Sequence, residues 1–186
     1  MKIRIAIAAG ALALAGCGNS VGGDTAALEE RVQVLEDQLT IQRVITDYSA
    51  NLDARDYDGY VGLFTEDGVW ANGETRHEGQ GEIREMLTSL FGEVEEGFVN
   101  TSSFHQISNF EIDVEGDEAA AKSRFIFVMR GDGGAPTNML SGQYHDKLVR
   151  VDGTWKIAER VDHTLMPTSE EWVAEVESWG GNTFDD

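Results

Sequence analysis

The stretch "VITDYSANLDARDYDGYVGLF", residues 44–64 of a chain of 186, decides the fold. From Ile41 to Leu52, apolar residues recur in steps of four, three and four, which predicts one buried stripe along an amphipathic helix. Asp53 follows the stripe directly. Because a carboxylate at the edge of a buried face is costly unless another group pairs with it or a reaction uses it, we expect a partner elsewhere in the chain.

The first sixteen residues read as a signal segment and not as part of the folded domain. Two basic residues precede an apolar run, 5–15, that is too short to span a bilayer as a stable helix. The run ends in "LAGC", which resembles the lipobox of bacterial lipoproteins, so we expect cleavage before Cys17 and lipid attachment to it. The alternative is a plain secretory signal with an incidental cysteine.

The residues after the signal indicate a tether and a location. Cys17 is the only cysteine, so no disulfide can form within the chain, and residues 17–25 form a small polar linker. We expect a lipid-anchored protein on the periplasmic side of a bacterial cell envelope. Gly18 follows the cysteine where an inner-membrane retention signal would have aspartate, so by resemblance to enteric lipoproteins the outer membrane is favoured.

The composition limits the classes of partner. The formal net charge is −20. Such an acidic chain repels nucleic acid and anionic headgroups, so we expect no nucleic-acid role. With one cysteine and four scattered histidines, no metal-site spacing is present, and "GDGGAP" is a turn and not a phosphate-binding loop.

The order of elements predicts an α+β domain over residues 26–167. A long helix comes first, and its early part carries a second stripe, Leu28, Val32, Leu35 and Leu39, with coiled-coil spacing. A short helix near 57–64, a turn at 66–68, a strand through Val69 and a helix ending at Gly92 follow. Hairpin-linked strands come next, with turns at 115–117 and 152–153. This segregation favours helices packed on one curved antiparallel sheet.

Residues 168–186 are expected to form a C-terminal helix and tail. Pro167 ends the last strand, and Thr168 with Glu171 fits a capping box. Trp172 and Trp179 would lie on one face of this helix, which suits a docking face or a lid.

Four segments together resemble the SnoaL-like domain of the nuclear transport factor 2-like superfamily. They are "IQRVITDYSANLDARDYDGYVGLFTEDGVW", "GQGEIREML", "SFHQISNFEIDVEGDEAAAKSRF" and "GQYHDKLVRVDGTWKIAER", between residues 41 and 160. The resemblance implies a cone in which a bent sheet wraps around helices and encloses a deep apolar pocket. It also implies a homo-dimer or homo-trimer.

The resemblance suggests a catalytic set. In the scytalone dehydratase and bile acid dehydratase group, an Asp late in the first helix pairs with a His on a pocket-facing strand. Asp53 and His105 fall at those positions, and Tyr48 has the spacing of the tyrosine in the bile acid dehydratases. Imidazole can exchange a proton near neutral pH, a carboxylate can orient it, and a phenol can polarise a carbonyl.

Each assignment has a structural alternative. Asp53 could be a surface carboxylate paired with Arg55, His105 a strand histidine and Tyr48 a core residue. An ideal helix also turns Tyr48 about 140° away from Asp53.

Other side chains receive weaker assignments. Trp70 and Tyr144 are expected to line the pocket, with core packing as the alternative for Trp70. His145 would face outward, and Asp146 would pair with Arg160 as plain structure.

These observations predict a cofactor-independent lyase, of dehydratase type, on a small apolar, aromatic or polycyclic substrate. One alternative is an isomerase or polyketide cyclase with Asp53 as the base. The other is a ligand-binding envelope lipoprotein without catalysis, which resemblance of fold does not exclude.

Overall fold

A computed structural model of the chain describes residues 20–168, 170, 171 and 174. The chain divides into two units between Val34 and Leu35, inside helix α1 (Ser20–Ala54). In the first unit, the Leu28 and Val32 side chains are exposed. Helix α1 begins inside the segment 17–25 that we expected to be a linker. No helix among the described residues is long and apolar enough to cross a membrane.

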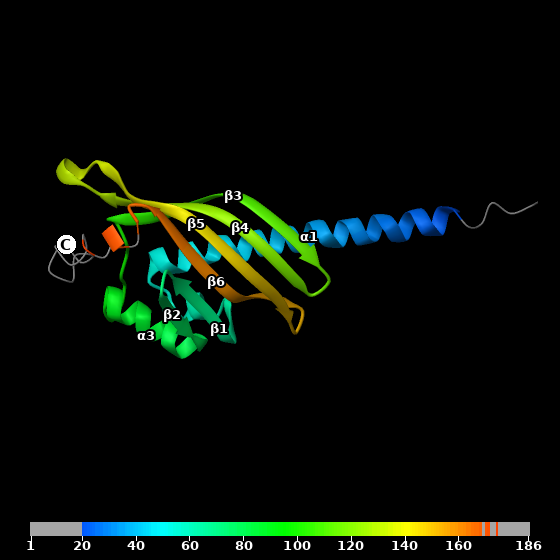
Figure 1. Cartoon of the computed structure of the whole chain (residues 1–186), viewed down its shortest axis with the longest axis horizontal. Coiled ribbons are helices and arrows are strands. Elements are labelled where there is room, and N and C mark those ends of the chain that lie inside the picture. Colours follow the sequence, from blue (N-terminus) through cyan, green and yellow to red (C-terminus); the bar gives the residue numbers. More distant parts are fainter. Residues whose placement is uncertain (1–19, 169, 172–173, 175–186) are drawn as a thin grey trace, which may run out of the picture. The chain divides into compact units, whose positions relative to one another are not determined.

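The second unit is built on one six-stranded sheet (Figure 1). Its strands lie in the order β2-β1-β6-β5-β4-β3. Their bounds are β1 (Phe64–Asn72), β2 (Thr75–Glu78), β3 (Ser103–Glu115), β4 (Glu118–Arg130), β5 (Pro136–Val151) and β6 (Thr154–Met166). The helices are α1, α2 (Tyr57–Val61) and α3 (Gly79–Phe91), and η1 (Asp132–Gly134) is a short 3-10 turn.

The predicted buried stripe is confirmed. Ile41 and Ile45 are fully buried, and Tyr48 and Leu52 nearly so, in one core with residues of α2, α3 and the sheet. Polar contacts fix this half of α1 on the sheet, because Gln38 donates to the carbonyl of Ile112 (2.9 Å) and the Trp155 indole donates to Asp37 (3.0 Å).

The predicted ends of several elements are confirmed. Helix α3 stops at Gly92, whose φ of 78° suits glycine. The hairpin turns at residues 115–117 and 152–153 lie between the expected strands. Strand β6 ends before Pro167, and the Thr168 amide donates to the Glu171 carboxylate (2.8 Å), as in a capping box. Trp172 and Trp179 lie outside the described residues.

Three predictions about the first half of the domain were wrong. The short helix ends at Val61, because Phe64 already pairs with Ile157 in the sheet. Residues 66–68 lie within β1 at a register shift, where the chain bulges and does not turn. The sheet is mixed and not antiparallel throughout, because β1 runs parallel to β6.

Candidate active site

Asp53 lies in the last turn of α1, and an uncommon helix end sets its position. The Arg55 amide donates to the Leu52 carbonyl (3.1 Å) and the Asp56 amide to the Asn51 carbonyl (2.8 Å), which is a Schellman motif. Glycine normally takes the left-handed position of this motif, but here Arg55 takes it with a φ of 57°. The Arg55 guanidinium lies 3.8 Å from the centre of the Phe91 ring, which holds this residue in place.

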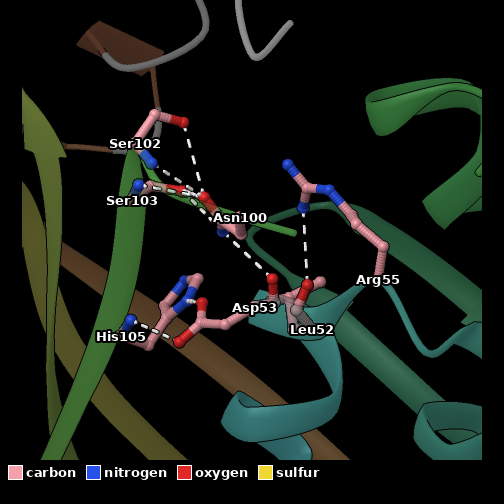
Figure 2. Close-up of polar contacts among 7 residues, drawn as sticks. All are labelled: Leu52, Asp53, Arg55, Asn100, Ser102, Ser103 and His105. Carbon is pink, nitrogen blue, oxygen red and sulfur yellow. Dashed lines mark hydrogen bonds and ion pairs between the residues drawn. The ribbon is translucent and has the colours of Figure 1, made fainter. Parts of the chain in front are cut away.

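Asn100 ties the helix end to the start of β3, as Figure 2 shows. Its side-chain amide donates to the Asp53 carbonyl (3.0 Å) and to the Ser103 hydroxyl (3.1 Å). Its side-chain oxygen accepts from the amides of Ser102 and Ser103, both at 3.1 Å. Asn100 was not predicted from the sequence. The signal was "NTSS", since an Asn just before a strand often caps its own backbone two residues on.

The Asp53 carboxylate holds His105 through both of its oxygens (Figure 2). The Oδ1 atom lies 2.6 Å from Nδ1 of the His105 ring, and Oδ2 accepts from the His105 backbone amide at 2.8 Å. An ionised carboxylate only accepts, so Nδ1 carries the proton and Nε2 is the nitrogen that can exchange one with a bound molecule. The ring stacks on Phe127, with centroids 4.5 Å apart.

The pair is reachable from solvent. The His105 side chain is 12% exposed and the Asp53 side chain 22%. A pocket of about 490 Å³ lies next to this end of α1, lined by Arg55, Phe91 and residues 93–102, including Asn100. Asp53 and His105 do not line this pocket. Asn100 does line it, and its side chain donates a hydrogen bond to the Asp53 carbonyl.

Tyr48 lies deeper, in a hydrogen-bonded aromatic cluster. Its hydroxyl accepts from the Trp70 indole at 2.9 Å and also shares a hydrogen bond with Tyr60. Burial raises the pKa of the Tyr48 phenol, although the Arg160 guanidinium lowers it. The space between α1 and the sheet therefore holds packed rings, and Tyr48 and Tyr144 are each only 2% exposed. In the part of the chain that the structure describes, Tyr48 forms no hydrogen bond or ring contact with Asp53 or His105.

A buried ion pair supports this cluster. Arg160 donates two hydrogen bonds to Asp146, at 2.6 and 2.7 Å, and both side chains are buried. Burial alone would lower the pKa of Arg160, but Asp146 raises it well above its usual range. The guanidinium also lies against the rings of Tyr48 (3.8 Å) and Tyr144 (4.4 Å). The expected pairing of Asp146 with Arg160 is confirmed.

A second carboxyl at this face, Asp162 on β6, was not predicted from the sequence either. It is partly buried and accepts a hydrogen bond from Thr164 at 3.0 Å. Burial raises its pKa to about 6, although Thr164, Arg160, Asn72 and His105 each act to lower it. Only its alternation with Arg160 along one strand could have indicated that it faces inward.

The remaining histidines form contacts with other residues. The rings of His145 and His163 contact each other, with centroids 4.4 Å apart, and His163 is exposed. His77 lies 5.9 Å from the Trp70 ring. Within the described ranges, no group of three His, Cys, Asp or Glu side chains could hold a metal ion. Cys17 lies outside those ranges.

Comparisons with known proteins identify the fold and the family. The profile of the SnoaL-like domain matches residues 33–161. An NTF2-like protein with a cystatin-like fold from Novosphingobium aromaticivorans superposes with a TM-score of 0.66, at 20% identity, over 83% of this chain and 96% of that one. This likeness confirms the predicted nuclear transport factor 2-like fold.

Two further relatives have more similar sequences. A candidate scytalone dehydratase from Novosphingobium aromaticivorans is 30% identical, over 77% of this chain and 89% of that one, with a TM-score of 0.55. An uncharacterized protein of Mycobacterium tuberculosis is 28% identical over 138 residues, which are 70% of this chain and 87% of the relative. The chain therefore belongs to the SnoaL-like domain family.

Proposed function

We propose that this protein is a cofactor-independent lyase that removes water, or a related leaving group, from a small apolar, aromatic or polycyclic substrate. The Asp53–His105 contact carries this proposal, since both oxygens of one carboxylate orient one imidazole beside solvent. The likeness to a candidate scytalone dehydratase supports the same class of reaction.

In this proposal, each member of the pair has a separate role. Nε2 of His105 takes a proton from a carbon next to a carbonyl group of the substrate. The electrons of that C–H bond form the new double bond, and the oxygen leaves with the electron pair of the C–O bond. The leaving oxygen takes the proton from His105 and becomes water. Asp53 holds the imidazole in one tautomer and stabilises the imidazolium that forms. The two hydrogen bonds that Tyr48 accepts leave its O–H as a donor that can polarise an oxygen.

The same contacts weigh against Asp53 as the base. A base needs a lone pair that is directed at the substrate. Both oxygens of Asp53 already accept hydrogen bonds from His105, one from the ring and one from the backbone. An isomerase or cyclase that used Asp53 directly would have to use the second lone pair of an oxygen that already accepts a hydrogen bond from His105. In such an enzyme, His105→Ala would leave much of the rate and Asp53→Asn would remove it.

One observation favours the ligand-binding alternative. Tyr48 and Tyr144 are packed in the core. Among the described residues, Asp53 and His105 line neither the pocket beside Arg55 nor the pocket beside His77, each of about 490 Å³. A protein that only binds a ligand in the envelope would need no turnover. The experiment must therefore separate binding from reaction.

The test is a screen with β-hydroxy ketones fused to aromatic or alicyclic rings. Formation of the conjugated product is followed by absorbance and mass spectrometry in wild type, His105→Ala and the matched control His145→Ala. We expect turnover by wild type and the control, and a loss of about 10²–10⁴-fold in His105→Ala. Full activity in His105→Ala would overturn the assignment, and binding without turnover in wild type would favour the binding protein.

A further inference from the structure

The pocket beside Arg55, of about 490 Å³, has no part in the proposed reaction. Its wall comes from Arg55 at the end of α1, from Phe91 at the end of α3, and from residues 93–102, which connect α3 to β3. Its volume suits a small organic ligand, since ligand pockets measure about 300–1,000 Å³. Neither Asp53 nor His105 lines it, so the groups that would recognise such a ligand are other side chains.

A largely buried positive charge lies in the wall of this pocket. Arg55 is 9% exposed, and its guanidinium lies 3.8 Å from the centre of the Phe91 ring and 5.9 Å from that of Phe98. One terminal nitrogen donates to the Leu52 carbonyl at 3.5 Å, and the other points away from that carbonyl (Figure 2). A guanidinium has five N–H donors in a planar fork that matches the two oxygens of a carboxylate. Arg55 therefore suits an anionic group on a ligand.

Three carboxylates, those of Glu93, Glu95 and Glu96, line the same pocket and are exposed. Among the residues that line it, Arg55 is the only basic one. A ligand with negative charge alone would be repelled by the three glutamates, and a ligand with positive charge alone would be repelled by Arg55. A zwitterion, which has a carboxylate and an ammonium group, is attracted by both parts of the wall.

The pocket also has apolar surface for a ring. Val94 and Phe98 line it, and they are 40% and 37% exposed. An aromatic ring that packs on Phe98 would remove this surface from water and gain the edge or stacking contacts that rings prefer. The pocket beside His77 has the same volume, but no Lys or Arg lines it, so it lacks an anchor for a carboxylate.

We propose that the pocket beside Arg55 binds an aromatic amino acid, or an aromatic zwitterion of similar size. The ligand carboxylate accepts hydrogen bonds from the Arg55 guanidinium, the ring packs on Phe98, and the ammonium group lies among the three glutamates. This binding site is separate from the Asp53–His105 pair. The inference goes beyond the proposed lyase function and does not depend on it.

The first test compares three probes by calorimetry at neutral pH. L-Phenylalanine carries both charges, 3-phenylpropionate lacks the amine, and 2-phenylethylamine lacks the carboxylate. Phenylalanine should bind about 2–5-fold more tightly than 3-phenylpropionate, because the glutamates that attract its ammonium group are exposed. It should bind about 10–100-fold more tightly than 2-phenylethylamine, which makes no charged hydrogen bond with Arg55. No binding of phenylalanine, or equal or tighter binding of either other probe, would overturn the inference.

Arg55→Gly removes the guanidinium and preserves the helix end, because the φ of 57° at this position suits glycine. The affinity for phenylalanine and for 3-phenylpropionate should fall about 10–100-fold, and the affinity for 2-phenylethylamine should not fall. Arg55→Asn is a second uncharged variant, since asparagine also adopts this backbone conformation. Phe98→Ser should weaken all three probes. If a variant of Arg55 that is folded by circular dichroism binds phenylalanine as wild type does, the inference is wrong.

A matched pair of triple variants tests the glutamates. Replacing all three by Gln should reduce the affinity for phenylalanine to that for 3-phenylpropionate. The control replaces Glu29, Glu30 and Glu36 by Gln, which removes the same charge from exposed positions on α1 that do not line the pocket. The control should keep the difference between the two probes. Equal effects of the two triple variants would assign the difference to net charge and overturn the role of the glutamates.

His105→Ala separates this site from the proposed lyase. Phenylalanine should bind to this variant as tightly as to wild type, because His105 does not line the pocket. A loss of binding would place the probe at the Asp53–His105 pair and overturn the inference. Turnover of the β-hydroxy ketones without binding of phenylalanine would overturn the inference and leave the lyase intact. Binding of phenylalanine that needs Arg55, in a protein without turnover, would support the inference and count against the lyase alone.

Discussion

Asp146→Asn is expected to be among the most destabilising single changes in this domain. Asp146 is 3% exposed, and it accepts two hydrogen bonds from Arg160, which is fully buried. Among the described residues, none accepts a hydrogen bond from the third guanidinium nitrogen, Nη1. Removing the negative charge leaves a buried cation without compensation, which costs about 3–5 kcal/mol.

The assay is urea unfolding followed by circular dichroism. With a slope of about 2 kcal/mol per molar urea, the midpoint should fall by about 1.5–2.5 M. The matched control is Asp47→Asn, which breaks an ion pair between exposed side chains, Arg43 and Asp47 (77% and 38% exposed). That control should cost about 0.5 kcal/mol or less.

A second variant tests the cause of the loss. Asp146→Leu combined with Arg160→Met replaces both charges by apolar side chains of similar volume, so it should recover most of the stability. If Asp146→Asn costs no more than Asp47→Asn, or if the double variant is less stable than Asp146→Asn, the reasoning about an uncompensated buried cation is refuted.

Three further predictions follow from other parts of the chain. The raised pKa of Asp162, about 6, means that the folded state keeps its proton longer than the unfolded chain does. Wild-type stability should therefore fall by about 1–2 kcal/mol, relative to Asp162→Asn, as pH rises from about 4 to 7; equal pH profiles in urea unfolding would contradict this. Cys17→Ala should move the protein from the membrane to the soluble fraction in the native host, and an unchanged distribution would contradict lipidation. Leu35 and Leu39 are 58% and 68% exposed, so Leu35→Glu with Leu39→Glu should dissociate a homo-oligomer in sedimentation velocity; the same sedimentation coefficient in both proteins would contradict that interface.

Local patterns were sufficient for much of the fold. The buried stripe from Ile41 to Leu52 follows from helical spacing, and the stops at Gly92 and Pro167 follow from the backbone preferences of glycine and proline. The parallel pairing of β1 with β6 did not follow, because residues far apart in the sequence determine it and no turn signals it. The sequence around Gly68 predicts a turn, but the structure has a bulge there. Pairing with β6, which is distant in the sequence, keeps this segment in the sheet.

The site was predicted less completely than the fold. The resemblance to the family predicted that Asp53 and His105 pair, and in the structure their side chains are in contact. Asn100 and Asp162 were missed, because their roles depend on which elements meet in space. Arg55 was considered only as a partner of Asp53, although it holds a left-handed helix end that favours glycine. Such an end has no sequence signal when another residue takes the glycine position.

The most direct test of the central claim is a double-mutant cycle on turnover. The rates of wild type, Asp53→Asn, His105→Ala and the double variant are compared on the substrate found by the screen. If the two residues act as one acid–base unit, the double variant should lose no more than His105→Ala alone. If the two losses multiply, or if His105→Ala keeps the wild-type rate, Asp53 and His105 do not form the catalytic pair of this protein.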